Sequence, residues 1–225
     1  MDAPDTPCGL EDPNIALLKK IVEQEDGRRP FLPTSASGPR EFITKEKGVS
    51  HDVHGNWRYE GNPGHYELYG ESDNLFHSEF GMDAAANVKS LKKFLPENAL
   101  HPTPMSGNAD WSHHGEWWGT WFRDCGMFGV IEQKRENLEL FVRCSQYMQS
   151  EGLRFILEAD RKRAFCNSGV IIWQLNEPWP NASCTNLTDW YQETKTAYYQ
   201  MKRAYEKSHV SLDYRSLTLP EKGSV

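Results

Sequence analysis

The sequence has no long hydrophobic run, no excess of positive charge and no export signal at its start. None of its apolar stretches approaches the roughly 18 residues of a membrane-spanning helix, and residues 1–7 lack the basic and then apolar pattern of a signal peptide. The 25 Lys and Arg against 32 Asp and Glu give a formal net charge of −7, which argues against nucleic acid or an anionic membrane as the main partner. We therefore expect a cytoplasmic protein with a neutral partner.

Cysteine, glycine and proline are also too sparse to dominate the structure. The five cysteines are scattered and never spaced as Cys-x-x-Cys, which favours reduced thiols over a disulfide framework or a zinc site. The 17 glycines and 13 prolines among 225 residues fall well below the roughly 25–30% of a low-complexity chain. At roughly 150 residues per domain, the chain is long enough for one large domain with its own core.

Aromatic residues, in contrast, are plentiful and lie in polar surroundings. There are 8 Trp, 9 Tyr and 10 Phe, and residues 111–118 read WSHHGEWW. A pyranose ring offers an apolar face that stacks on an indole and a rim of hydroxyls that need hydrogen-bond partners. The composition suits a carbohydrate ligand, although any single tryptophan is also an ordinary core residue.

Strand and helix patterns alternate along the chain. Short apolar or β-branched segments bounded by turn residues predict strands at residues 29–35, 48–54, 74–80 and 169–175. Apolar spacings of three and four predict helices at residues 14–25, 83–95, 137–164 and 190–205. The charged run at 158–163 is expected to form a solvated helix face. This alternation predicts an α/β fold with a parallel sheet.

The number of predicted strands is half of what a closed barrel needs. A (β/α)8 TIM barrel takes eight strands and roughly 250 residues, so four strands with an insertion at 96–129 amount to an incomplete barrel. Residues 209–219 read as a further strand with turn residues. We therefore divide the chain into a half-barrel at 1–207 and a linker or first strand of a following β-sandwich at 208–225.

Three of the predicted strands end in polar and aromatic side chains. Glu79 stands at the end of a short apolar strand, at the edge where parallel barrels carry their catalytic groups. A glutamate at a strand end is also a common surface residue, but the three ends carry the same kind of chemistry. The candidate substrate-binding residues are His51, Asp52, His54, Trp57, His77, Trp173, Asn176 and Glu177.

Glu79 with a second carboxylate would suit retaining glycoside hydrolysis. One carboxylate attacks the anomeric carbon and the other, roughly 5–5.5 Å away, protonates the leaving oxygen. No metal and no cofactor is predicted, because the adjacent His113 and His114 have neither HExxH nor His-x-His spacing.

At these residues the chain resembles glycoside hydrolase family 2, particularly its β-mannosidase-like and exo-β-glucosaminidase-like branch. Residues 78–81, SEFG, resemble the nucleophile motif, in which the Glu ends the seventh barrel strand. Residues 169–180 resemble the eighth strand, whose Trp, here Trp173, lines the innermost sugar subsite. Residues 26–37 resemble the fifth strand and its loop, and 51–57 resemble the sixth, with His51 where Gly is usual. The resemblance covers about residues 12–214 and implies a hydrolase of β-mannosides or β-glucosaminides.

The family's acid/base Glu has no counterpart in this chain. It ends the fourth strand, usually after an Asn, whereas the only Asn-Glu pair here is Asn176-Glu177, on the eighth. The resemblance therefore implies strands five to eight, the C-terminal half of the barrel. We expect little activity from this half without the other half or a complementing chain, because a nucleophile without a proton donor cannot expel a poor leaving group.

The alternative is a non-catalytic carbohydrate-binding protein. Such a protein would keep Trp57, Trp117 and Trp173 as sugar-stacking rings and would make Glu79 dispensable.

Overall fold

The structure is a computed structural model that describes residues 8–115 and 119–218. Its helices and strands, in chain order, are α1 (Pro13–Asp26), β1 (Asp52–His54), α2 (Gly64–Glu71), β2 (Phe76–Phe80), β3 (Ala84–Ala85), α3 (Val88–Phe94), η1 (Glu97–Ala99), η2 (Met105–Gly107), α4 (Ala109–His113), α5 (Thr120–Phe128), η3 (Arg135–Asn137), α6 (Leu138–Lys162), β4 (Val170–Ile172), β5 (Ser183–Cys184) and α7 (Thr196–Ala204).

A three-stranded parallel sheet in the order β1-β2-β4 organises the fold. β2 pairs with both neighbours, and both pairings shift register in the second half of the strand, between His77 and Phe80. β3 and β5 form a separate antiparallel pair. The described residues thus contain mixed α and β structure, and their strands do not close into a barrel.

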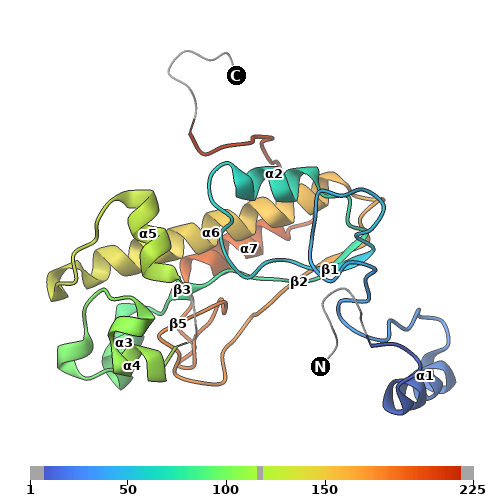
Figure 1. Ribbon diagram of the computed structural model, residues 1–225, viewed down its shortest axis with the longest axis horizontal. Coiled ribbons are helices and arrows are strands. Elements are labelled where there is room, and N and C mark those ends of the chain that lie inside the picture. The colour runs from blue at the N-terminus through green and yellow to red at the C-terminus, as the bar shows by residue number, and fades with distance from the viewer. Residues whose placement is uncertain (1–7, 116–118, 219–225) are drawn as a thin grey trace.

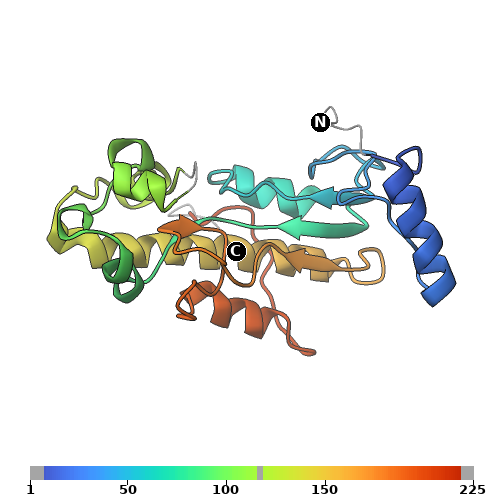
Figure 2. The same ribbon diagram turned by 90° about the horizontal axis from the view of Figure 1, so that it is seen from below.

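Three helices cover one face of the parallel sheet. α2, α6 and α7 lie side by side along it (Figures 1 and 2). Their apolar stripes bury a core that joins Val53 and Phe80 of the strands to Tyr66, Phe155 and Met201 of the helices. The opposite face of the sheet carries no helix in the part of the chain that the structure describes. One face is therefore a core, and the other is left for polar side chains.

The charged end of α6 is buried, and the expectation of a solvated face at 158–163 is wrong there. Glu158 and Asp160 are each only 3% exposed, because β2 and its preceding turn pack against Asp160, whereas Glu158 pairs with Arg154 of the same helix and with His209 of the tail. Asp160 accepts hydrogen bonds from His77 and Asn74. Periodicity placed the helix correctly, but the partners of its charged side chains come from elsewhere in the chain.

The insertion between β2 and β4 builds a second core around the first half of α6. Trp111 of α4 is buried there against Phe141, and its indole N–H donates to Ala99 O at 2.7 Å. Arg123 of α5 pairs with its neighbour Asp124 at 2.7 Å and with Asp83, the residue before β3, at 3.1 Å, so the Asp83 contact ties α5 to the β2–β3 segment. The insertion is a folded unit, not a loop.

The predicted strand at 29–35 is wrong. Pro30 and Pro33 have no N–H group to give to a ladder, and no strand forms there. The segment that runs beside β1 lies further along: Gly38 N donates to Asp52 O at 3.0 Å, and Ile43 N donates to His54 O at 2.8 Å.

Two of the predicted helices are shorter than expected, and the tail forms no strand. The predicted helix at 83–95 begins only at Val88, because Ala84–Ala85 pair with β5; α7 likewise begins at Thr196. No strand forms in residues 209–218, and Leu219 lies outside the described residues. The tail is held to α6 through side chains, since the Tyr214 hydroxyl pairs with Glu151 and Arg154.

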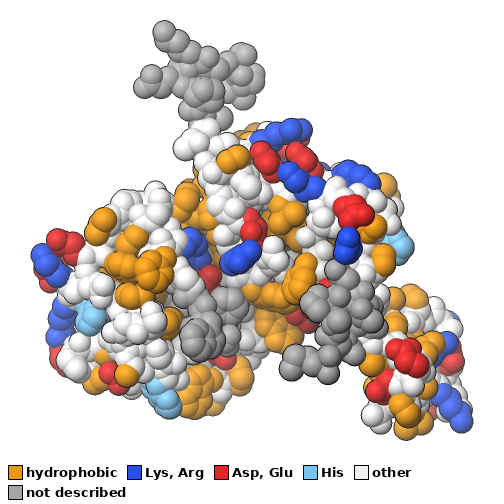
Figure 3. Space-filling view, viewed as in Figure 1, with side chains coloured by type: hydrophobic (Ala, Val, Ile, Leu, Met, Phe, Trp, Pro, Cys, Tyr) orange, Lys and Arg blue, Asp and Glu red, His pale blue; other side chains and the backbone are white. Residues whose placement is uncertain are grey.

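Helix α1 stands apart from the rest of the fold. Asp12 caps it by accepting from Asn14 N and Ile15 N, but none of its residues is buried. Leu17 and Leu18 are more than half exposed, and apolar side chains appear at its surface in Figure 3. None of the helices in the described ranges is long and apolar enough to cross a membrane.

Candidate active site

The carboxyl ends of β1 and β2 bring His54 and Glu79 together. The two residues are register partners in the parallel sheet, and His54 Nε2 lies 3.7 Å from Glu79 Oε1. Gly55 N donates to the Glu79 carbonyl at 2.6 Å, which fixes the backbone at this point. The side chain of Glu79 is 21% exposed and that of His54 is 10% exposed. Both side chains are therefore mostly buried but still reach solvent at the edge of the sheet.

Opposing influences act on the ionisation of Glu79. Partial burial raises the pKa of its carboxyl, the positive charge of His54 lowers it, and the negative charge of Asp52 raises it again. The net direction is upward from the ordinary value. Perturbed carboxyls of this kind cluster at functional sites.

Two serines that sequence reasoning missed complete the polar cluster. Ser35 Oγ lies 2.8 Å from His54 Nε2 and donates to Ser78 Oγ at 3.0 Å. Ser78 was quoted only as part of a motif, and Ser35 sits in a segment predicted to be a strand. No local sequence signal marks this contact, because it joins residues 19 and 43 positions apart.

Aromatic rings flank the same strand end. Trp57 packs edge-on against His54, with ring centroids 5.3 Å apart, and against Phe42 at 6.2 Å. A Cβ on Gly81 would lie 2.7 Å from the Trp57 ring and would collide with the Trp173 carbonyl. Gly81 is therefore required for the close approach of the segments that carry the two tryptophans.

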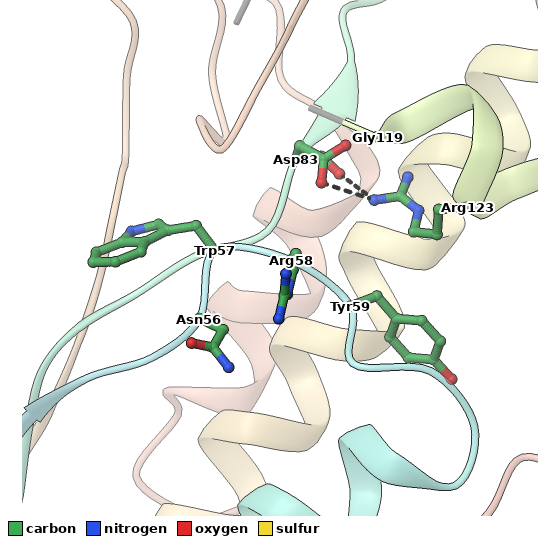
Figure 4. A pocket seen from close by; sticks show the side chains of 7 residues that line it. All are labelled: Asn56, Trp57, Arg58, Tyr59, Asp83, Gly119 and Arg123. Carbon is green, nitrogen blue, oxygen red and sulfur yellow. Dashed lines mark hydrogen bonds and ion pairs between the residues drawn. The ribbon is translucent and has the colours of Figure 1, made fainter. Parts of the chain in front are cut away.

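A cavity of about 610 Å³ opens beside Trp57 (Figure 4). It lies between the loop that follows β1 and Asp83, which stands between β2 and β3. Trp57 and Tyr59 point to opposite sides of their loop. The residues lining it are Asn56, Trp57, Arg58, Tyr59, Asp83, Gly119 and Arg123. Its size falls within the roughly 300–1,000 Å³ of small-molecule sites, and its walls mix rings with hydrogen-bonding groups.

The candidates that follow β4 lie at the same edge of the sheet. Trp173 N donates to Phe80 O at 2.7 Å, and the Trp173 side chain is 47% exposed. Asn176 is exposed, whereas Glu177 is buried and accepts a hydrogen bond from Gln174 Nε2 at 3.2 Å. The half-exposed ring of Trp173 is free to stack on a ligand.

Three of the predicted binding residues do not contact the Glu79 side chain. His77 faces the helices, fully buried, with Nδ1 2.8 Å from Asp160 Oδ2. His51 precedes β1 and lines another cavity, of about 560 Å³, with Phe76 and Ser168. Asp52 accepts from Ser37 N at 2.6 Å and acts on Glu79 only through its charge.

Two further expectations concern residues away from this cluster. Trp117 lies outside the described residues. Within residues 8–115 and 119–218, no three His, Cys, Asp or Glu side chains are arranged to hold a metal ion.

Comparisons with known proteins find similar sequences and similar solved structures. No family model matches the chain. β-Mannosidase B of Aspergillus flavus is 28% identical over 192 residues, covering 83% of this chain and 22% of that protein, and β-mannosidase B of Thermothelomyces thermophilus is 28% identical over 199 residues with the same coverage. The chain therefore spans about a fifth of the length of the curated relatives it matches.

Solved structures point the same way. The β-D-mannosidase of Dictyoglomus thermophilum superposes with a TM-score of 0.66 and 25% identity, over 84% of this chain and 22% of that one. The exo-chitosanase of Amycolatopsis orientalis, solved with PNP-β-D-glucosamine, superposes with a TM-score of 0.57 and 22% identity, over 83% of this chain and 23% of that one, and shows the shared fold alone.

The sequence relatives and the D. thermophilum structure are named β-mannosidases, which are glycoside hydrolases, and this chain is similar to them. These relatives support the β-mannosidase-like relationship to glycoside hydrolase family 2 that the motifs of the chain suggested.

Proposed function

We propose that this chain carries the nucleophile of a retaining β-glycosidase, and that Glu79 is that nucleophile. The observation that supports this most directly is the Glu79 carboxylate beside His54 at the carboxyl edge of the parallel sheet. In the proposed step, a Glu79 oxygen attacks the anomeric carbon, the bond to the leaving oxygen breaks, and that oxygen departs with the electron pair.

The order of the strands supports a more detailed assignment. β1, β2 and β4 are consecutive neighbours in one parallel sheet and take the places of the sixth, seventh and eighth barrel strands. The segment at 38–43, which bonds to β1, occupies the place of the fifth. The acid/base carboxylate then belongs to the end of the fourth strand, outside these residues, and activity needs the rest of the barrel or a complementing chain.

The substrate class follows from the relatives. The proteins similar to this chain are named β-mannosidases, and one similar structure is an exo-chitosanase solved with a glucosaminide. A β-mannoside or β-glucosaminide is therefore the proposed substrate, stacked on Trp173.

Covalent labelling tests the role of Glu79 without a proton donor. A 2-deoxy-2-fluoro-β-mannosyl fluoride has a leaving group that departs without protonation. We expect intact-mass spectrometry to show one added fluoromannosyl group and peptide mapping to place it on Glu79, with no adduct on the Glu79→Gln variant. An adduct on another residue, or none on the folded chain, would contradict the assignment.

Turnover of an unactivated glycoside tests the missing acid/base. We expect the chain alone to release no sugar from a methyl β-mannoside, because the carboxylate proposed to protonate the leaving oxygen belongs to the fourth barrel strand. Sustained turnover would show that a proton donor lies within these residues.

The half-exposed Trp173 and the cavity beside Trp57 also suit a non-catalytic carbohydrate-binding protein. In that case no adduct forms, and calorimetry shows sugar binding that Glu79→Gln leaves unchanged and Trp173→Ala abolishes.

A further inference from the structure

We propose that Ser35 is a positioning residue that keeps the proton of neutral His54 on Nε2, the ring nitrogen that lies 3.7 Å from Glu79 Oε1. The inference rests on the proposed role of Glu79 as the nucleophile. Ser35 lies in the segment 26–37, to which the sequence motifs gave no catalytic or binding residue. Here it is assigned the positioning of the His54 proton beside that nucleophile.

The direction of the hydrogen bonds determines the tautomer of His54. The Ser35 hydroxyl donates to Ser78 Oγ at 3.0 Å, and the Ser78 hydroxyl donates to Val53 O at 3.5 Å. A hydroxyl carries one proton, so Ser35 has none left for the ring and its oxygen accepts. In this arrangement the His54 nitrogen 2.8 Å away is the donor, which puts the proton of neutral His54 on Nε2.

The same nitrogen is the one that faces the nucleophile. His54 Nε2 lies 3.7 Å from Glu79 Oε1, so the proton that Ser35 holds on Nε2 places positive charge density near the carboxylate. In the other tautomer Nε2 would carry a lone pair in place of the proton, and the favourable charge density near the carboxylate would be lost. The charged groups that act on Glu79 are His54 and Asp52, both from the β1 strand, and the segment that carries Ser35 offers the cluster only hydroxyl and backbone groups.

The segment that carries Ser35 is tied to β1 independently of the His54 contact. Ser37 N donates to Asp52 Oδ2 at 2.6 Å, and Gly38 and Asp52 exchange two backbone hydrogen bonds at 3.0 and 3.2 Å. Asp52 therefore anchors this segment, and the Ser35 hydroxyl is presented to His54 by a backbone that does not depend on it. Removing the hydroxyl should disturb the tautomer more than the fold.

Nitrogen-15 NMR of the imidazole rings reads the tautomer directly in the 225-residue chain. We expect the neutral His54 ring to show Nε2–H in the wild type and in Ser35→Thr, which keeps the hydroxyl, and a shift toward Nδ1–H in Ser35→Ala. Ser37→Ala is the matched control, because its hydroxyl donates to Thr34 O and does not touch His54. Nδ1–H in the wild type, or an unchanged ring in Ser35→Ala, overturns the proposal.

Titration of the Glu79 side-chain carboxyl by carbon-13 NMR gives the consequence for the nucleophile. We expect Ser35→Ala to move the midpoint upward by about 0.5 pH unit or more, because the carboxylate loses a favourable N–H dipole, while Ser35→Thr and Ser37→Ala match the wild type. A midpoint that does not move, or that moves equally in Ser37→Ala, overturns the inference.

The pH profile of inactivation by the fluoromannosyl fluoride links both readouts to chemistry. Its acid limb should shift upward in Ser35→Ala with the carboxyl titration. If no variant is labelled, the proposed nucleophile fails while the two NMR results still decide what Ser35 does. If labelling occurs on Glu79 and the acid limb is the same in Ser35→Ala, the nucleophile stands and the role of Ser35 fails.

Discussion

The two faces of the parallel sheet each carry a histidine beside a carboxylate, yet the two pairs differ in almost every physical respect. On the face covered by helices, His77 and Asp160 are 0% and 3% exposed and 2.8 Å apart. On the open face, His54 and Glu79 are 10% and 21% exposed and 3.7 Å apart. The same residue types form a buried structural bond on one side and a loosely held reactive group on the other.

The difference arises from the register of β2. In a regular strand, successive side chains alternate between faces, and His77 and Glu79 would share one. The pairing of β2 shifts register on both sides after His77. Ser78 and Glu79 therefore both contact the cluster of Ser35 and His54. His77 and Phe80 lie instead on the side that the helices cover. A local irregularity thus separates the structural histidine from the carboxylate proposed as the nucleophile.

Removing the charge of Asp160 should give the largest effect. Asp160 accepts from His77, Asn74 and Arg163, and leaving such a buried partner uncompensated costs about 3–5 kcal/mol. We expect Asp160→Asn to lower the free energy of unfolding in urea by this amount. If the free energy of unfolding fell by less than about 1 kcal/mol, the His77–Asp160 pair would contribute no more than an exposed ion pair does. The two faces of the sheet would then not differ in this respect.

Acid should weaken the covered face through His65 of α2. Burial lowers the pKa of His65 from 6.5 to about 4. Between pH 6.5 and pH 4, His65 is therefore protonated in the unfolded chain but neutral in the folded chain. Stability is then lost as the pH falls from 6.5 to 4, by up to about 3 kcal/mol. Urea unfolding at several pH values measures this slope.

The matched variant for this slope is His65→Gln, whose amide can still donate to Gly152 O, the acceptor of the His65 ring at 3.2 Å. We expect the variant to lose most of the slope between pH 6.5 and 4. An unchanged slope would assign the acid sensitivity to other groups.

The contrast between the faces also marks the limit of sequence reasoning. Periodicity predicted α1 and α6 to within two residues, since both are long and regular. Turn signals placed Glu79 and His54 at neighbouring strand ends, because parallel strands share a carboxyl edge. The register shift in β2 has no local signature, so His77 was named as a binding residue although its side chain bonds to Asp160 of α6. Ser35 was missed because its partners lie 19 and 43 positions away. Asp160 was expected in solvent because its partners lie more than 80 residues away.

Crowding beside the tryptophans should produce a smaller effect on the open face. An added Cβ on Gly81 meets the Trp57 ring and the Trp173 carbonyl, and overpacking of this kind costs about 1–3 kcal/mol. We expect Gly81→Ala to lose stability in this range and to slow fluoromannosyl labelling. Gly126→Ala in α5, where a Cβ meets nothing within 4 Å, should instead keep or gain stability; equal behaviour of the two variants would contradict the crowding.

Neutralising Glu79 should have the smallest effect on stability, although it is the carboxylate proposed for the chemistry. Glu79→Gln keeps the shape of the side chain and removes a charge that partial burial already disfavours, as the raised pKa of its carboxyl indicates. We expect the free energy of unfolding to stay within about 1 kcal/mol of the wild type or to rise slightly, while labelling is lost. A loss of stability like that of Asp160→Asn would mean that Glu79 holds the fold together as Asp160 does. A catalytic carboxylate held at some cost to stability is what separates the open face from the covered one, since reactive groups commonly reduce the stability of the folds that carry them.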